Sequence, residues 1–188
     1  ITSFLVTAAV RALRRFPALN AARDGTDVLF RRYCDIAISV EVASGARSTL
    51  LRNAECMSFA AIEAEVWPPP AAESPEPPFE DDCGTFRLLQ CGLAGAMLST
   101  PQLYPGHAAA LAAHEIRHRA VAVSSRVEIR RMMYIALTYD HCVVDGSESV
   151  QFLYAIKASL ERPETLLTRE LPEAPSPPAQ LRPRIRVA

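Results

Sequence analysis

The sequence predicts an α+β fold built on a mixed or antiparallel sheet. Apolar side chains recur at helical spacing from Phe4 to Phe16 and again after Gly146, whereas from Ile36 to Val42 they alternate with polar ones, as in a half-buried strand. The strands between the helices follow one another irregularly, and several connections are short enough for hairpins. The chain has 188 residues, of which 49% are hydrophobic, so it can bury one substantial core.

The first half predicts a helix, a hairpin and a second helix. Arginines lie opposite the apolar face of the helix over 4–16. A turn at Asp24-Gly25 precedes the strand over 36–42, and Ser48–Leu51 is the expected return strand. Ser58 then caps a short helix that extends to Val66.

The second half supplies the rest of the sheet. Strands are expected over Thr85–Cys91, Val121–Val123 and Val127–Leu137, with a loop over Gly92–Gly106. The segment Ala108–Ile116 is also expected to be a strand, although its alanines would suit a helix. A helix from Gly146 to Pro163 closes the core, with these side chains facing inward: Val150, Leu153, Ile156 and Leu160.

Two proline-rich segments divide the chain. Six prolines between Trp67 and Pro78 predict a stiff linker, assigned to 67–80, inserted within a core over 1–171. A proline-rich ligand for a partner domain is the less favoured interpretation of this linker. Five prolines and several arginines predict an extended tail over 172–188.

Composition excludes several classes of function. The net charge of −1 gives no electrostatic basis for binding nucleic acid, and no apolar run is long enough to span a membrane. The five cysteines are widely spaced, with no Cys-x-x-Cys pair, so reduced thiols are expected rather than disulfides or a zinc knuckle. Reduced thiols favour the cytosol or an organelle matrix over secretion.

The candidate catalytic residues are His141 and Asp145. They lie four residues apart in a polar turn after an apolar β-like run, and Gly146 follows the aspartate. An imidazole at the end of a rigid strand with a carboxylate nearby is a common arrangement for a general base. A turn histidine that only caps the strand is the alternative.

A second motif suggests zinc chemistry. His114-Glu115-Ile116-Arg117-His118 matches H-E-x-x-H, in which two histidines one helical turn apart bind zinc. The apolar segment that follows at once, over 119–123, breaks the long helix that such a site needs, and no third ligand is evident. We therefore expect no metal site, keep a zinc hydrolase as a minor alternative, and attribute the match to chance on an exposed strand end. His107, in a Pro-Gly-His turn, is interpreted as a loop residue.

Besides the His-x-x-x-Asp-Gly signature, the chain contains several stretches that match a known family in the family's order. They are Pro17–Ala21, Tyr33–Val40, Leu51–Glu55, Gly84–Phe86, Thr100-Pro101, Val127–His141 and Phe152-Leu153. Through these stretches, residues 1 to about 170 resemble the catalytic domain of the acyltransferases of 2-oxo acid dehydrogenase complexes, most closely the dihydrolipoamide succinyltransferase branch. The signature is shared with chloramphenicol acetyltransferases.

The resemblance implies a two-layer chloramphenicol acetyltransferase-like fold, assembled into homo- or hetero-trimers within a larger complex. It implies His141 as the base that deprotonates the thiol of dihydrolipoamide or coenzyme A, and Asp145 as the carboxylate that holds the loop in shape. Coenzyme A is the expected co-substrate, and no covalently bound cofactor is expected. Because the match includes no lipoyl domain, another protein is expected to supply the dihydrolipoyl thiol.

Several residues depart from the family pattern. The family's Gly-Thr-Phe-Thr-Ile-Ser-Asn is Gly84-Thr85-Phe86-Arg87-Leu88-Leu89-Gln90 here, so both hydroxyl residues after the phenylalanine are missing. Losing one oxyanion donor costs about a hundred- to a thousand-fold in rate. Cys142 stands where the family has arginine. These departures favour a degenerate subunit with a structural or assembly role in a large complex, and the alternative is an active succinyltransferase-type enzyme. The resemblance implies the mitochondrial matrix as the location, with the bacterial cytoplasm as the alternative.

Overall fold

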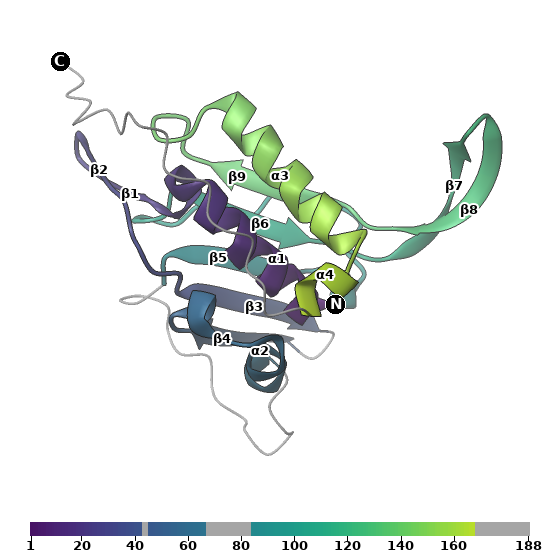
Figure 1. The fold of residues 1–188 in the computed structure, drawn as a ribbon, viewed down its shortest axis with the longest axis horizontal. Helices are drawn as coiled ribbons and strands as arrows, with labels where there is room; N and C mark the ends of the chain where they lie inside the picture. Colours follow the sequence, from purple (N-terminus) through teal and green to yellow (C-terminus); the bar gives the residue numbers. More distant parts are fainter. Residues whose placement is uncertain (43–44, 67–83, 168–188) are drawn as a thin grey trace.

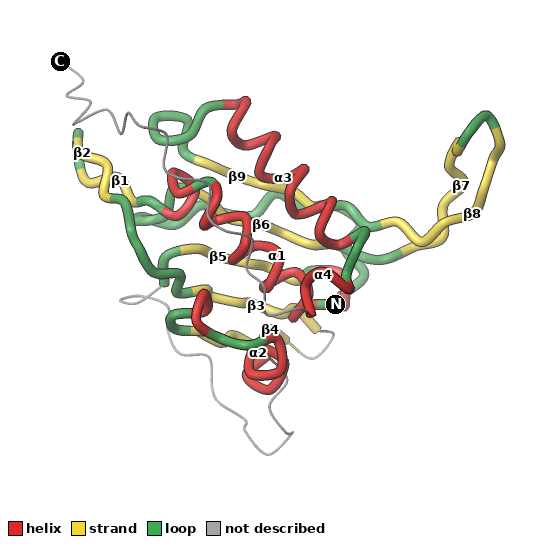
Figure 2. Tube along the Cα trace, in the orientation of Figure 1, coloured by secondary structure: helices red, strands yellow, loops and turns green. Residues whose placement is uncertain are grey.

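The computed structural model describes residues 1–42, 45–66 and 84–167. Its centre is a five-stranded sheet with the order β4-β3-β5-β6-β9. Helices α1 (Thr2–Arg15) and α3 (Gly146–Leu160) lie side by side on one face of this sheet (Figures 1 and 2). The predicted α+β fold with a mixed sheet is therefore confirmed.

The sheet combines parallel and antiparallel pairs. Strand β3 (Ile36–Val42), β5 (Phe86–Gln90) and β6 (Ala109–Ala113) run parallel to one another. The edge strands β4 (Gly45–Leu51) and β9 (Ile135–Tyr139) are antiparallel to β3 and β6, respectively. The N-terminal ends of β3, β5 and β6 thus meet the C-terminal end of β9 at one end of the sheet.

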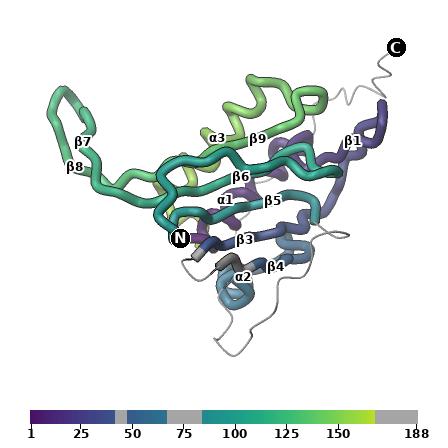
Figure 3. Tube along the Cα trace, turned by 180° about the vertical axis from the view of Figure 1, so that it is seen from behind, coloured from purple at the N-terminus to yellow at the C-terminus, as the bar shows by residue number. Residues whose placement is uncertain are grey.

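Smaller elements surround this sheet. Strands β1 (Ala22–Asp24) and β2 (Asp27–Leu29) form a short hairpin, whereas the hairpin of β7 (Arg117–Val123) and β8 (Arg126–Met132) projects away from the body (Figures 1 and 3). Helix α2 (Phe59–Val66) packs against α1 and β4. The remaining short helices are η1 (Pro17–Asn20), η2 (Ala54–Cys56), η3 (Gly92–Ala94) and α4 (Glu164–Leu167).

The core lies between the sheet and helices α1 and α3. Along β5 the side chains of Phe86, Leu88 and Gln90 are buried, while those of Arg87 and Leu89 lie on the other face and are half-buried. The Phe86 and Phe152 rings pack 6.0 Å apart between their centroids. Each such fully buried ring stabilises the fold by about 1.5–3 kcal/mol.

The strand expected over Ala108–Ile116 is confirmed as the shorter β6, which lies within the sheet, where small side chains fit. Two other expectations about the second half need correction. The single strand predicted over Val127–Leu137 is two strands, β8 and β9, separated at Met133-Tyr134. Val150 does not face inward but is 66% exposed, and Phe152 takes the inward position on α3.

Two further expectations concern the proline-rich segments and the absence of a membrane-spanning segment. The linker assigned to 67–80 and the tail over 172–188 lie outside the described residues. Within the parts of the chain that the structure describes, no helix combines the length and apolarity needed to cross a bilayer.

Candidate active site

His141 lies in the turn that joins β9 to α3. Its side chain is exposed, and its ring centroid lies 5.4 Å from that of Tyr139, the last residue of the strand. Asp145 is also exposed and is the N-cap of α3, where its Oδ1 accepts a hydrogen bond from the Glu148 N–H at 2.8 Å. The two predicted site residues therefore share one turn, with Asp145 fixing the start of the helix.

Asp140 holds the turn around His141 through three sets of hydrogen bonds. Its backbone N–H donates to the Ala108 carbonyl at 2.8 Å, and its own carbonyl accepts from the amides of Val143 and Val144. Its side-chain Oδ1 accepts from the Cys142 N–H at 2.9 Å. The backbone on both sides of His141 is thus fixed by the residue before it. Asp140 was not among the predicted site residues, although its position directly before the histidine could have indicated a role.

The carboxylates of this turn are biased towards the charged form. The hydrogen bond from the Cys142 amide, together with the charge of Arg23, lowers the pKa of Asp140. The hydrogen bond from the Glu148 amide likewise lowers the pKa of Asp145. Since each folded-state pKa lies below the unfolded value, the contribution to stability is present above the unfolded pKa and is lost as the pH falls through the folded one. Both carboxylates therefore make their full contribution to the turn at neutral pH.

Leu89 lies towards the opposite end of the sheet from His141. It is paired with Ala112, Ala112 is paired with Ala136, and His141 follows five residues after Ala136. A rise of about 3.3 Å per residue and a strand spacing of about 4.8 Å place the two positions on the order of 15–20 Å apart in one chain. A site that uses both positions would therefore need two chains.

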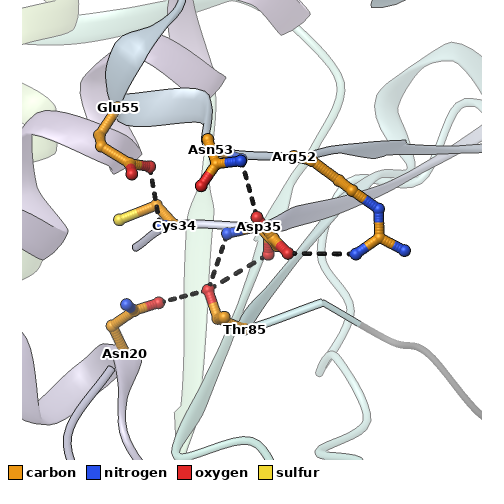
Figure 4. Close-up of polar contacts among 7 residues, drawn as sticks. All are labelled: Asn20, Cys34, Asp35, Arg52, Asn53, Glu55 and Thr85. Carbon is orange, nitrogen blue, oxygen red and sulfur yellow. Dashed lines mark hydrogen bonds and ion pairs between the residues drawn. The ribbon is translucent and has the colours of Figure 1, made fainter. Parts of the chain in front are cut away.

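A buried polar network joins β3 and β5 at the same end of the sheet as His141 (Figure 4). The Thr85 hydroxyl donates to Asn20 Oδ1 at 2.7 Å and accepts from the Asp35 amide at 3.0 Å. The Asp35 carboxylate accepts from the Asn53 amide at 2.7 Å and pairs with Arg52 at 3.3 Å. A Cβ on Gly84 would collide with the Asp35 carbonyl, and its φ of +71° is the left-handed region, so glycine is required there.

The structure does not form the arrangement that the H-E-x-x-H motif needs. His114 follows β6 and His118 lies in β7, so the two are on extended backbone and not one helical turn apart. His114 is completely buried, which corrects the expectation of an exposed strand end. Its Nε2 accepts from the Ser99 amide at 2.7 Å, and its Nδ1 contacts the Tyr134 carbonyl at 3.0 Å. Both ring nitrogens therefore have protein partners, and the imidazole carries its proton on Nδ1.

The remaining residues considered in the sequence are His107 and the cysteines. His107 lies in the loop before β6, as expected, but its side chain is buried. Of the four cysteines in the described part of the chain, none forms a disulfide; Cys34 and Cys91 are buried, and Cys56 and Cys142 are exposed. Burial, with Glu55 nearby, raises the pKa of the Cys34 thiol to about 12. Cys34 therefore remains a neutral packing residue.

Two hollows lie on the helical side of the fold, away from the His141 turn. One of about 620 Å³ is lined by α1 and α3 around Arg15, Tyr154 and Arg162. The other, of about 490 Å³, lies among α1, η2, α2 and the end of α4. Neither of these two hollows is lined by His141 or Leu89.

The fold and the His141 turn agree with a known family of acyltransferases. Residues 1–168 match the family model for the 2-oxoacid dehydrogenases acyltransferase (catalytic domain). The chain belongs to this family. The resemblance inferred from the sequence is thereby confirmed.

Relatives and solved structures agree with this assignment. The chain is 44% identical over 167 residues to the dihydrolipoyllysine-residue succinyltransferase component of the 2-oxoglutarate dehydrogenase complex of Pseudomonas aeruginosa, a match that covers 88% of the chain but 41% of the relative. It superposes with a TM-score of 0.75, at 20% identity, on a crystal structure of a dihydrolipoamide acetyltransferase from Azotobacter vinelandii, covering 89% of this chain and 71% of that one. A chloramphenicol acetyltransferase gives a TM-score of 0.53 at 16% identity, covering 89% and 77%. The predicted two-layer acyltransferase fold is confirmed.

Proposed function

We propose that this chain is a succinyltransferase-type subunit of a 2-oxo acid dehydrogenase complex in which the acyl-transfer site is degenerate, so that the chain by itself serves a structural or assembly role. The observation that carries this proposal is the presence of leucine at position 89. Leu89 occupies the outer face of β5, where the acyltransferase family has a serine. Its side chain has no group that could donate a hydrogen bond to an oxyanion.

Relatives support the choice of this position. The catalytic mechanism of the Azotobacter vinelandii acetyltransferase has been studied through a serine, a histidine and an asparagine. In that protein the asparagine follows the histidine at the same distance along the chain as Asp145 follows His141. The serine precedes the histidine at the same distance along the chain as Leu89 precedes His141. The base is therefore retained here, while its hydroxyl partner is replaced by an apolar side chain.

The projecting hairpin supports the assembly role. Val127 is 78% exposed and Ile129 is 75% exposed on β8, which stands away from the core in Figures 1 and 3. Exposed apolar side chains on a projecting element favour contact with another chain. A trimer of this or related chains would cover the hairpin and would bring the His141 end of one chain to the Leu89 end of the next.

An active succinyltransferase-type enzyme is the second candidate, and the intact His141 turn favours it. Asp140 and Asp145 both hold the turn with hydrogen bonds, so the base is presented as it would be in a working site. A related chain with a serine or threonine opposite His141 could then complete the site in a mixed assembly, with coenzyme A and an external dihydrolipoyl thiol as substrates.

Acyl transfer between succinyl-coenzyme A and free dihydrolipoamide tests the proposal. We expect the purified chain to turn over no faster than its His141→Ala variant, and light scattering to show that both form the same oligomer. Histidine-dependent turnover by the chain alone would contradict the degenerate role. No turnover after addition of related acyltransferase chains would exclude the second candidate.

A further inference from the structure

We propose that Arg23 is a positioning residue for His141 and that it acts through Asp140. Arg23 Nε lies 2.8 Å from Asp140 Oδ2, and the side chains are 51% and 18% exposed, respectively. The other carboxylate oxygen, Oδ1, receives the Cys142 N–H. The arginine therefore holds one oxygen of the carboxylate while the second fixes the backbone just beyond the histidine.

Arg23 can hold the Asp140 carboxylate because hydrogen bonds connect its strand, β1, to the His141 turn through Ala108. The Ala108 amide donates to the Ala21 carbonyl at 3.0 Å, and the Asp140 amide donates to the Ala108 carbonyl at 2.8 Å. The hairpin partner of Arg23 is Val28, so the strand that carries the arginine is itself paired. These bonds keep the guanidinium within reach of the carboxylate without ordering a long free segment.

The Arg23–Asp140 ion pair adds a restraint to those that the backbone bonds of Asp140 already supply. The backbone bonds of Asp140 fix the start and the end of the turn, and its Oδ1 accepts from the Cys142 amide between them. By binding Oδ2, Arg23 restrains the carboxylate in the orientation that accepts this amide. The family places an arginine directly after the histidine, where this chain has Cys142; Arg23 supplies a cation to the same turn from a different element.

The kinetic part of the test rests on the proposed function, because it needs acyl transfer. A second part therefore measures the turn without catalysis. In a Leu89→Ser chain, which restores a hydroxyl, Arg23→Gln is expected to lower kcat about threefold with little change in KM, and Arg23→Lys to recover part of the loss. Lys157→Gln, which removes a more exposed ion pair on α3, is the control and should leave kcat unchanged.

Hydrogen exchange of the Cys142 amide, followed by NMR in the unmodified chain, is the second part. Arg23→Gln should speed this exchange by about threefold or more, and in an Asp140→Asn background it should add no further effect, because the arginine acts only through that carboxylate. Unchanged exchange, or an equal effect of Arg23→Gln in both backgrounds, would overturn the proposal. Faster exchange without any turnover in the Leu89→Ser chain would uphold the positioning role and count only against the proposal that Leu89 is what disables the site.

Discussion

The proposed function predicts that a serine in place of Leu89 gives the chain acyl-transfer activity. The position lies on the outer face of β5, where Arg87 and Leu89 are half-buried and the core residues point the other way. A serine there adds a hydroxyl donor without entering the core. Because the base and its turn are already formed, this hydroxyl is the component that the site lacks.

The expected gain follows from the energy of an oxyanion hydrogen bond. One donor contributes about a hundred- to a thousand-fold in kcat, or roughly 2.7–4 kcal/mol of transition-state stabilisation. Against this, loss of a half-buried leucine side chain costs about 0.8–1.5 kcal/mol of folding free energy, half of the value for full burial. A domain with about 5–15 kcal/mol of stability tolerates that loss, so the variant should remain folded.

The assay is succinyl transfer to dihydrolipoamide, with Leu89→Ala as the matched control. Alanine removes the same bulk but adds no hydroxyl, so only Leu89→Ser should gain activity, and addition of His141→Ala should abolish the gain. Equal activity of the serine and alanine variants would refute the reasoning, because the effect would then come from space and not from a hydrogen bond. A folded serine variant without activity would refute it as well.

Three further outcomes are expected. Thr85→Val leaves Asn20 Oδ1 and the Asp35 amide without their buried partner, so urea unfolding should show a loss of about 1–3 kcal/mol; an unchanged midpoint would argue against the network. Iodoacetamide at pH 8 should modify the exposed Cys142 and Cys56 well before Cys34, whose raised pKa keeps it protonated, as mass spectrometry of peptides would show. Treatment with EDTA should leave the melting temperature unchanged, because protein groups already contact both ring nitrogens of His114; a fall would revive the zinc interpretation.

Local patterns in the sequence were sufficient to predict most of the elements. Helical spacing predicted α1, the Ser58 cap predicted α2, and period-two alternation predicted β3. In the structure the Ala61 amide does donate to Ser58 Oγ at 3.2 Å. These features depend on neighbouring residues, so they can be predicted without knowledge of distant contacts.

The errors arose where tertiary contacts decide the outcome. Val150 and Phe152 are both apolar on α3, and only the position of the sheet and α1 determines that the phenylalanine faces the core. His114 was interpreted as part of an exposed strand end, yet its side chain is buried and bonds to the distant Ser99 amide. The Arg23–Asp140 pair joins segments far apart in the sequence, and no local pattern indicates it.

The most direct test of the account mixes two chains that are each expected to be inactive. The unmodified chain has His141 but no hydroxyl at position 89, whereas the Leu89→Ser, His141→Ala double variant has the hydroxyl but no base. After co-expression, we predict succinyl transfer that neither chain shows alone, because the two positions meet only between chains. A mixture as inactive as its parts, alongside an active Leu89→Ser chain, would contradict the claim that the site is divided between two chains.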